Sequence, residues 1–193
     1  MSRILRYVTV VLLALPLVLL PLAAQAADHD YVGSKKCKMC HLKEYKSWET
    51  TKMAQSFENL KPGERAEAKQ AAGLDPDKDY TTDVTCLPCH TTGYGRPGGF
   101  VDIATTPELA GIGCETCHGA GKTYLDDGYM TLKNKEYKKA ELVAVGMIDT
   151  VQEAQCAGCH NADSPFVGDD FVFDFEANKD LSTHETHPLK YAH

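Results

Sequence analysis

Two cysteines separated by two residues, with a histidine directly after the second, occur four times in this chain of 193 residues. The four copies are Cys37-Lys38-Met39-Cys40-His41, Cys86-Leu87-Pro88-Cys89-His90, Cys114-Glu115-Thr116-Cys117-His118 and Cys156-Ala157-Gly158-Cys159-His160. At this spacing both thiols can form thioethers with the two vinyl groups on one edge of a porphyrin, and the next side chain lies under the iron. The pattern therefore predicts four covalently attached haem c groups. Their proximal iron ligands are His41, His90, His118 and His160.

Other uses of closely spaced cysteines explain the pattern less well. Zinc ribbons, redox dithiols and disulfide frameworks all contain cysteine pairs at such spacings. None of them requires a histidine after every pair, and all eight cysteines of the chain belong to the four motifs. Haem attachment is therefore the preferred interpretation.

A targeting segment is predicted at residues 1–26. Arg3 and Arg6 precede an almost unbroken apolar run, and Ala24-Gln25-Ala26 follows it as a small-residue cleavage site. An uncleaved membrane anchor is the alternative, but prolines interrupt a run that is shorter than the roughly 20 apolar residues of a spanning helix. We expect cleavage, no stable membrane insertion afterwards, and a tetrahaem domain over residues 27–193 that is periplasmic or extracellular.

The charge of the chain narrows the class of partner. The chain has 20 basic and 27 acidic residues and a formal net charge of −7, and loss of Arg3 and Arg6 with the targeting segment makes the charge −9. An acidic surface argues against nucleic acid and anionic membranes, and it predicts redox partner proteins with a basic docking face. A charge that serves mainly solubility is the alternative.

The fold is expected to be mainly α, a small single-domain multihaem cytochrome c with the haems forming the core and little regular sheet. Four haems share so few residues that the polypeptide alone has too little apolar side chain to offset its chain entropy. Helices are predicted at residues 43–60, 64–72 and 137–155, the last one frayed at Gly146, and an extended stretch is predicted at 171–175. The glycines of 93–99 predict tight turns that pass close to a flat group, either a haem face or an ordinary loop neighbour.

The distal ligands of the irons are not determined by the motifs. The candidates outside the motifs are His29, His184, His187, His193, Met53, Met130 and Met147. A second histidine would keep a haem at low potential, a methionine would raise the potential, and an empty position would bind a small molecule. Met53 follows Trp48 on a predicted helix, where a gap-filling core methionine is the alternative. His184 and His187 lie in a polar stretch that is either a source of ligands or a solvated tail.

The chain resembles the cytochrome c-554 family of tetrahaem electron carriers. The resemblance rests on Gly33-Ser34-Lys35-Lys36-Cys37 through Trp48, Leu60-Lys61-Pro62, Leu74-Asp75-Pro76-Asp77-Lys78-Asp79-Tyr80-Thr81, Gly111-Ile112-Gly113-Cys114-Glu115 and Cys117-His118-Gly119. It implies a mainly helical fold around closely stacked haems. It also implies a carrier that takes electrons from hydroxylamine oxidation and passes them towards the membrane.

Ligands implied by the resemblance differ partly from those of the family. Met53 stands where the family prototype has an axial histidine, and Met130 is the usable donor near the position of another. The family's C-terminal His-Glu pair resembles His184-Glu185, which favours His184 over His187. The prototype's second haem lacks a strong distal ligand, so the resemblance implies an open iron above His90. Thioether ligands would raise potentials, and the prototype's own partner is therefore not assumed for this chain.

Three functions remain as hypotheses. The preferred one is an electron carrier without substrate chemistry of its own, which transfers electrons between redox partner proteins. The alternative is a reductase of nitric oxide or hydroxylamine at a five-coordinate second haem, although Arg96 is the only cationic side chain close in sequence to His90. A subunit of a haem filament, joined through a terminal histidine such as His193, is the third.

Overall fold

The computed structural model describes residues 30–126, 128–164, 173–180 and 183–188. Its elements within these ranges are α1 (Ser34–Cys37), α2 (Leu42–Trp48), η1 (Ser56–Leu60), α3 (Ala66–Ala71), α4 (Leu87–His90), η2 (Pro107–Leu109), α5 (Cys114–His118), α6 (Lys122–Asp126), α7 (Lys139–Ala144), α8 (Glu153–Ala157) and α9 (Phe175–Asn178), where η denotes a 3-10 helix. The described residues contain no strand, and their one β-type pairing is an isolated bridge between Thr91 and Ala110. The mainly helical fold class is confirmed. The predicted targeting segment lies outside the described residues.

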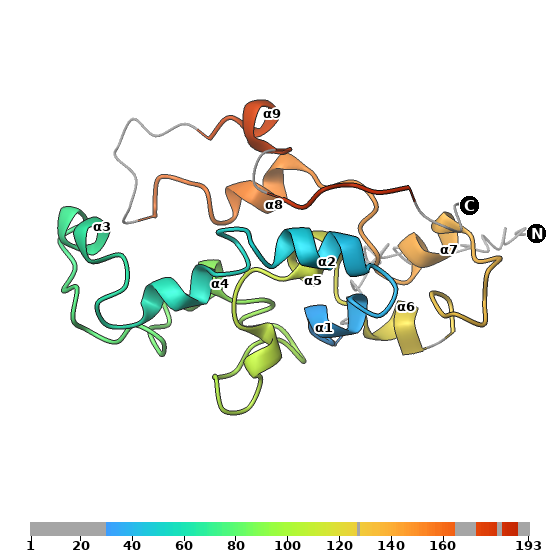
Figure 1. Cartoon of the computed structure of the whole chain (residues 1–193), viewed down its shortest axis with the longest axis horizontal. Helices are drawn as coiled ribbons and strands as arrows, with labels where there is room; N and C mark the ends of the chain where they lie inside the picture. Colours follow the sequence, from blue (N-terminus) through green and yellow to red (C-terminus); the bar gives the residue numbers. More distant parts are fainter. Residues whose placement is uncertain (1–29, 127, 165–172, 181–182, 189–193) are drawn as a thin grey trace, which may run out of the picture.

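The short helices are strung along an elongated molecule (Figure 1). Helix α3 lies at one end, α7 lies towards the other, and α1, α2 and α5 lie between them, with α8 and α9 along one long edge. Each cysteine-histidine motif lies on or next to such a helix. Cys37 ends α1, Cys86 directly precedes α4, α5 contains the whole third motif, and Cys156 lies in α8. The short helices therefore place the attachment sites, and they are too short to form long helix–helix interfaces.

The prediction of one helix over residues 43–60 is wrong beyond Trp48. Helix α2 ends there, turns follow, and the chain resumes as the 3-10 helix η1. The β-branched Thr50 turns its hydroxyl back to the carbonyl of Ser47 at 2.8 Å, a local bond that competes with continued helix. The Trp48 indole also donates to the carbonyl of Ile112 at 2.9 Å, so a tertiary contact holds the end of α2 against the segment before the third motif.

The helix predicted at 64–72 forms as α3 but begins later. Arg65 has φ 52, a left-handed conformation that cannot be part of the helix, and α3 starts after it. The helix ends before Gly73, as predicted, because Gly73 adopts φ 71.

The helix predicted at 137–155 is two helices. Gly146 has φ 101, which a helix cannot contain, so the helix ends before this residue instead of fraying at it. Helices α7 and α8 are therefore separate. The fourth motif still begins in a helix, since α8 contains Cys156. The extended stretch predicted at 171–175 is wrong at its end: Phe175 begins α9, and the Asp174 carboxylate caps it by accepting from the Ala177 amide at 2.9 Å. Residues 171 and 172 lie outside the described residues.

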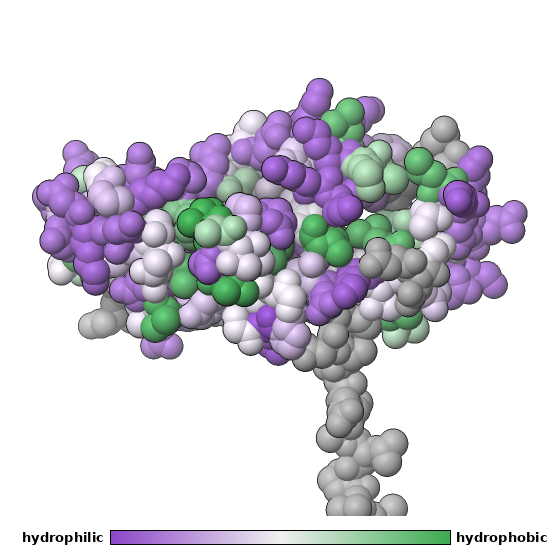
Figure 2. Space-filling model, turned by 90° about the horizontal axis from the view of Figure 1, so that it is seen from below, coloured by the Kyte–Doolittle hydropathy of each residue, from purple (hydrophilic) through white to green (hydrophobic). Residues whose placement is uncertain are grey.

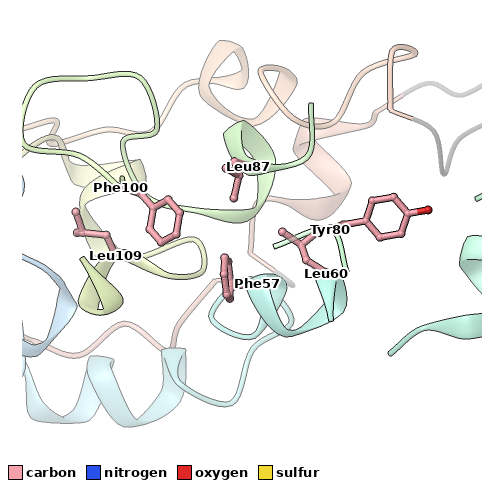
Figure 3. Close-up of a cluster of buried hydrophobic side chains, with 6 residues drawn as sticks. All are labelled: Phe57, Leu60, Tyr80, Leu87, Phe100 and Leu109. Atoms are coloured by element: carbon pink, nitrogen blue, oxygen red, sulfur yellow. The ribbon is translucent and has the colours of Figure 1, made fainter. Parts of the chain in front are cut away.

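The apolar core lies around the second motif. Six buried side chains form one cluster, which Figure 3 shows: Phe57, Leu60, Tyr80, Leu87, Phe100 and Leu109. The rings of Phe57 and Phe100 are 5.5 Å apart and tilted, an arrangement typical of aromatic pairs in cores. Since Leu87 begins α4 and α4 packs against η1, this cluster fixes the helix that contains the second motif.

The glycine-rich loop at 93–99 makes the tight turns predicted for it. Gly93 and Gly98 have φ of 72 and 68. A Cβ at Gly93 would lie 2.6 Å from the ring of Tyr31, and one at Gly98 would lie 2.8 Å from the side chain of Asp30. The flat group beside Gly93 is therefore a tyrosine ring at the start of the described chain.

Candidate haem sites

The first three motifs meet at a small polar junction. The Thr92 hydroxyl donates to the carbonyl of Gly111 and accepts from the Gly113 amide, both at 2.8 Å. The Ser34 hydroxyl accepts from the Cys114 amide at 3.1 Å. Thr92 follows the second motif, Ser34 begins α1, and Gly113 leads into α5, so these bonds join segments that are far apart in sequence. A Cβ at Gly113 would lie 2.6 Å from the Ser34 oxygen, which explains a glycine at this position.

Cysteines of different motifs lie against one another. The neighbouring Cys37 thiol lowers the pKa of Cys114 to about 6, and the pKa of Cys37 is raised in turn. A thiol contact with Cys159 likewise lowers the pKa of Cys89 to about 7. None of the eight cysteines forms a disulfide. The attachment points therefore approach in two pairs, first motif with third and second with fourth.

Two motif histidines are held in the tautomer that binds iron. The Nδ1 of His90 donates to the carbonyl of Ser56 at 2.6 Å, and the Nδ1 of His118 donates to the carbonyl of Ile148 at 3.3 Å. A carbonyl can only accept, so the proton lies on Nδ1 and the Nε2 lone pair is left for a metal. Burial lowers the pKa of both imidazoles and favours the neutral form, which is the one that ligates.

The other two motif histidines differ in their exposure. His41 is half-buried at the start of α2, and His160 is exposed. The His160 ring stacks on Phe173, with 4.8 Å between ring centres and 18° between planes. A phenylalanine of the predicted aromatic stretch therefore covers the histidine of the fourth motif.

His184 lies opposite His118. The two ring centres are 6.2 Å apart. An imidazole nitrogen about 2 Å from a metal, with its ring centre roughly 1 Å further on, puts two rings on opposite sides of one ion about 6 Å apart. The Nδ1 of His184 donates to the carbonyl of Glu185 at 2.9 Å, which leaves its Nε2 free, and the Glu185 amide is anchored on the Ser47 hydroxyl at 2.9 Å. The spacing fits a ligand pair.

The remaining candidate ligands lie in turns. Met53 is half-buried, and its carbonyl accepts from the Ile112 amide at 3.0 Å, next to the third motif. Met130 is half-buried and its amide donates to the carbonyl of Tyr124, in the turn after α6. His187 lies 3.7 Å from the Glu185 carboxylate. His29 and His193 lie outside the described residues.

The donor set fits covalently bound haem c. Paired thiols, neutral imidazoles with a free Nε2, and an opposed histidine are the groups that such a haem requires. Met39, inside the first motif, is apolar and 73% exposed, which suits a side chain that would cover a porphyrin. Neither a disulfide nor a cluster of three or more His, Cys, Asp or Glu side chains placed to hold a metal ion is formed in the described part of the chain.

Glu115 was missed as a site residue by the sequence reasoning. It is only 2% exposed, and its carboxylate accepts from the amides of Val32, Gly33 and Gly121. The available signal was its position between Cys114 and Cys117, where a charged side chain has no role in the attachment chemistry itself. Thr92 and Ser34 carried no such signal.

Comparison with known proteins agrees with this chemistry. The family model for cytochrome c554 and c-prime matches residues 36–119, which contain the first three motifs. The chain is 41% identical over 140 residues to cytochrome c-554 of Nitrosomonas europaea, a match that covers 70% of this chain and 59% of that protein. No helix in the described ranges could span a bilayer.

A solved structure extends the likeness to the fold. The reduced state of cytochrome c554 from Nitrosomonas europaea superposes with a TM-score of 0.74 at 35% identity, and the match covers 86% of this chain and 90% of that one. Identity at this level over nearly the whole of both chains shows more than a common architecture. The chain belongs to the cytochrome c-554 family, a family of haem-containing electron-transfer proteins.

Proposed function

We propose that this chain is a periplasmic tetrahaem c-type cytochrome that transfers electrons between redox partner proteins. The observation that carries the proposal is the contact between cysteines of different motifs. Cys37 lies near Cys114 and Cys89 lies near Cys159, while the side-chain amide of Gln155, directly before Cys156, donates to the carbonyl of Cys117 at 3.1 Å. Porphyrins attached at these points would form a connected row, in the order first, third, fourth and second motif. Such a row suits electron transfer through the protein.

The distal ligands follow from the same geometry and from the family resemblance. We assign His184 to the iron bound by His118, because the two rings lie at the separation of a ligand pair. Met53 and Met130 are the thioether donors proposed for two further irons. The iron of His90 is proposed to have no strong distal ligand. Thioether ligation would raise the potential of those haems above that of the bis-histidine haem.

An acidic lobe beside the second motif supports a partner with a basic docking face. Six exposed carboxylates lie on η1, α3 and the loops on either side of α3: Glu58, Glu64, Glu67, Asp75, Asp77 and Asp79. Fewer exposed basic residues, Lys61, Arg65 and Lys78, lie among them, and Lys61 pairs with Glu58 at 2.5 Å. Figure 2 shows hydrophilic residues gathered over this end of the molecule. Clustered carboxylates would steer a basic protein towards the second haem.

The first test is the cofactor count. The full chain is produced in a bacterium with a haem c maturation system, and the purified periplasmic protein is weighed by intact mass spectrometry. The proposal predicts the chain from residue 27 onwards plus the mass of four haems. A chain with fewer haems, or one that still contains residues 1–26, would contradict the respective part of the proposal.

The reductase alternative is tested on the same holoprotein. Under excess reductant, a carrier does not accelerate the consumption of nitric oxide or hydroxylamine. Both molecules should then disappear at the rate measured in haem-free buffer. Electron paramagnetic resonance of the oxidised protein then shows whether a high-spin ferric signal is present and whether nitric oxide removes it. Catalytic consumption of either molecule would favour the reductase and overturn the carrier.

A further inference from the structure

The Glu115 side chain connects three separate segments at the third motif. Its carboxylate accepts hydrogen bonds from the amides of Val32 at 3.0 Å, Gly33 at 2.8 Å and Gly121 at 2.7 Å. Val32 and Gly33 immediately precede α1, which ends in the first cysteine of the first motif. Three charge-assisted bonds to backbone amides make a firm connection between the first and third attachment sites.

The charge of this carboxylate is buried beside both sites. Every hydrogen-bond partner of its two oxygens is a donor, which is the arrangement that suits the ionised form. Burial opposes this and raises the pKa of Glu115, while the three amides lower it. The carboxylate is close to the first motif as well as to the third, because Gly33, which donates to it at 2.8 Å, directly precedes α1.

A negative charge in a poorly solvated place stabilises an oxidised, more positive iron over the reduced one. We propose that Glu115 is a positioning residue that fixes the first and third haems relative to each other and lowers the midpoint potentials of that pair. This inference rests on the tetrahaem assignment above. It assigns a role to a residue that the attachment chemistry does not use.

The test compares three variants of the full holoprotein. Glu115→Gln removes the charge and replaces one accepting oxygen by a donor, Glu115→Asp keeps the charge but is one methylene shorter, and Glu49→Gln removes an exposed charge after α2. Each is followed by potentiometric titration of all haems and by thermal unfolding. Haem content of the parent is measured first, so that a failure of the tetrahaem assignment is recognised separately.

The expected result is an upward shift of two of the four midpoints in Glu115→Gln, with a lower unfolding temperature. Glu115→Asp should unfold at a lower temperature with midpoints closer to those of the parent, and Glu49→Gln should match the parent in both. Parental midpoints in Glu115→Gln would overturn the proposed effect of the charge. If that variant yields no holoprotein, Glu115→Asp decides, because parental stability there would overturn the positioning role.

Discussion

The second and fourth motifs are built into the protein in opposite ways. The second lies at α4, next to the buried cluster of Leu60, Leu87 and Leu109, and its half-buried histidine is held by the carbonyl of Ser56. The fourth begins in α8, which has no buried residue, and its His160 is exposed. Side-chain packing therefore joins the second attachment site to the apolar core, whereas the fourth would depend on its haem for most of its burial. The family model ends at residue 119 and so leaves out the fourth motif.

Few bonds join the fourth-motif region to the rest. The Gln155 amide donates to the carbonyl of Cys117 at 3.1 Å, and the Ile148 amide donates to the carbonyl of His118 at 2.9 Å. The junction of Ser34, Thr92 and Gly113, in contrast, ties the first three motifs together through buried groups. Stability should accordingly be concentrated in residues 30–126.

Removal of single haems gives the largest effect. Cys86→Ala with Cys89→Ala should abolish stable protein, because it empties the site next to the apolar cluster. Cys156→Ala with Cys159→Ala should leave residues 30–126 protected and expose the later chain to protease. Limited proteolysis with mass spectrometry checks both. Equal cleavage patterns in the two variants would remove the distinction between the regions.

Truncation of the apolar cluster comes next. Leu109→Ala should destabilise the holoprotein by about 2–5 kcal/mol, the usual cost of deleting a fully buried leucine side chain. Val143→Ala, at an exposed position on α7, should cost less than about 0.5 kcal/mol. Denaturant unfolding of both variants measures the difference. A similar loss in both would mean that the haems, and not this cluster, provide the stability near the second motif.

The polar junction of Ser34, Thr92 and Gly113 should contribute less to the free energy of unfolding than the apolar cluster. Thr92→Val keeps the shape of the side chain but removes the hydroxyl, so the carbonyl of Gly111 and the amide of Gly113 lose a buried partner. The expected loss is about 1–3 kcal/mol. Thr82→Val, at an exposed position, is the matched control. Unchanged unfolding of Thr92→Val would show that the three motifs are held together by other contacts.

Replacement of Met53 tests a ligand within the well-packed region and should leave stability nearly unchanged. Met53→His should lower the midpoint potential of one haem, since a second imidazole favours the ferric state over a thioether. Met53→Ala should make that haem high-spin. Redox titration and paramagnetic resonance report the two effects. If both variants match the parent, Met53 is a packing residue.

Charge reversal on the acidic lobe is expected to have the smallest effect. Glu64→Lys with Asp77→Lys should slow electron transfer to horse cytochrome c, a basic protein, by a few-fold at low salt, and the difference should vanish at high salt. Glu136→Lys, in the loop before α7, should have little effect. Stopped-flow traces at several ionic strengths provide the measurement. Equal slowing by Glu136→Lys would mean that net charge, rather than this lobe, guides the encounter.

The sequence predicted the family and the mainly helical class better than the helix boundaries. The motifs and the mainly helical class could be read directly, because thioether attachment requires a fixed local spacing. The end of α2 could not, since it depends on a bond from Trp48 to Ile112, 64 residues away. The same holds for Glu115, whose partners Val32 and Gly33 are more than 80 residues distant. Lys69 is similarly unexpected: it is almost fully buried and donates to the carbonyl of Lys61 at 2.6 Å.

The most direct test of the account counts the electrons that the protein delivers. Fully reduced holoprotein is mixed without oxygen with excess ferric horse cytochrome c, and the reduced product is measured optically. The account predicts four equivalents per chain, delivered through one docking encounter after another. Fewer than four equivalents, or electrons that leave only towards nitric oxide or hydroxylamine, would contradict a four-haem carrier between proteins.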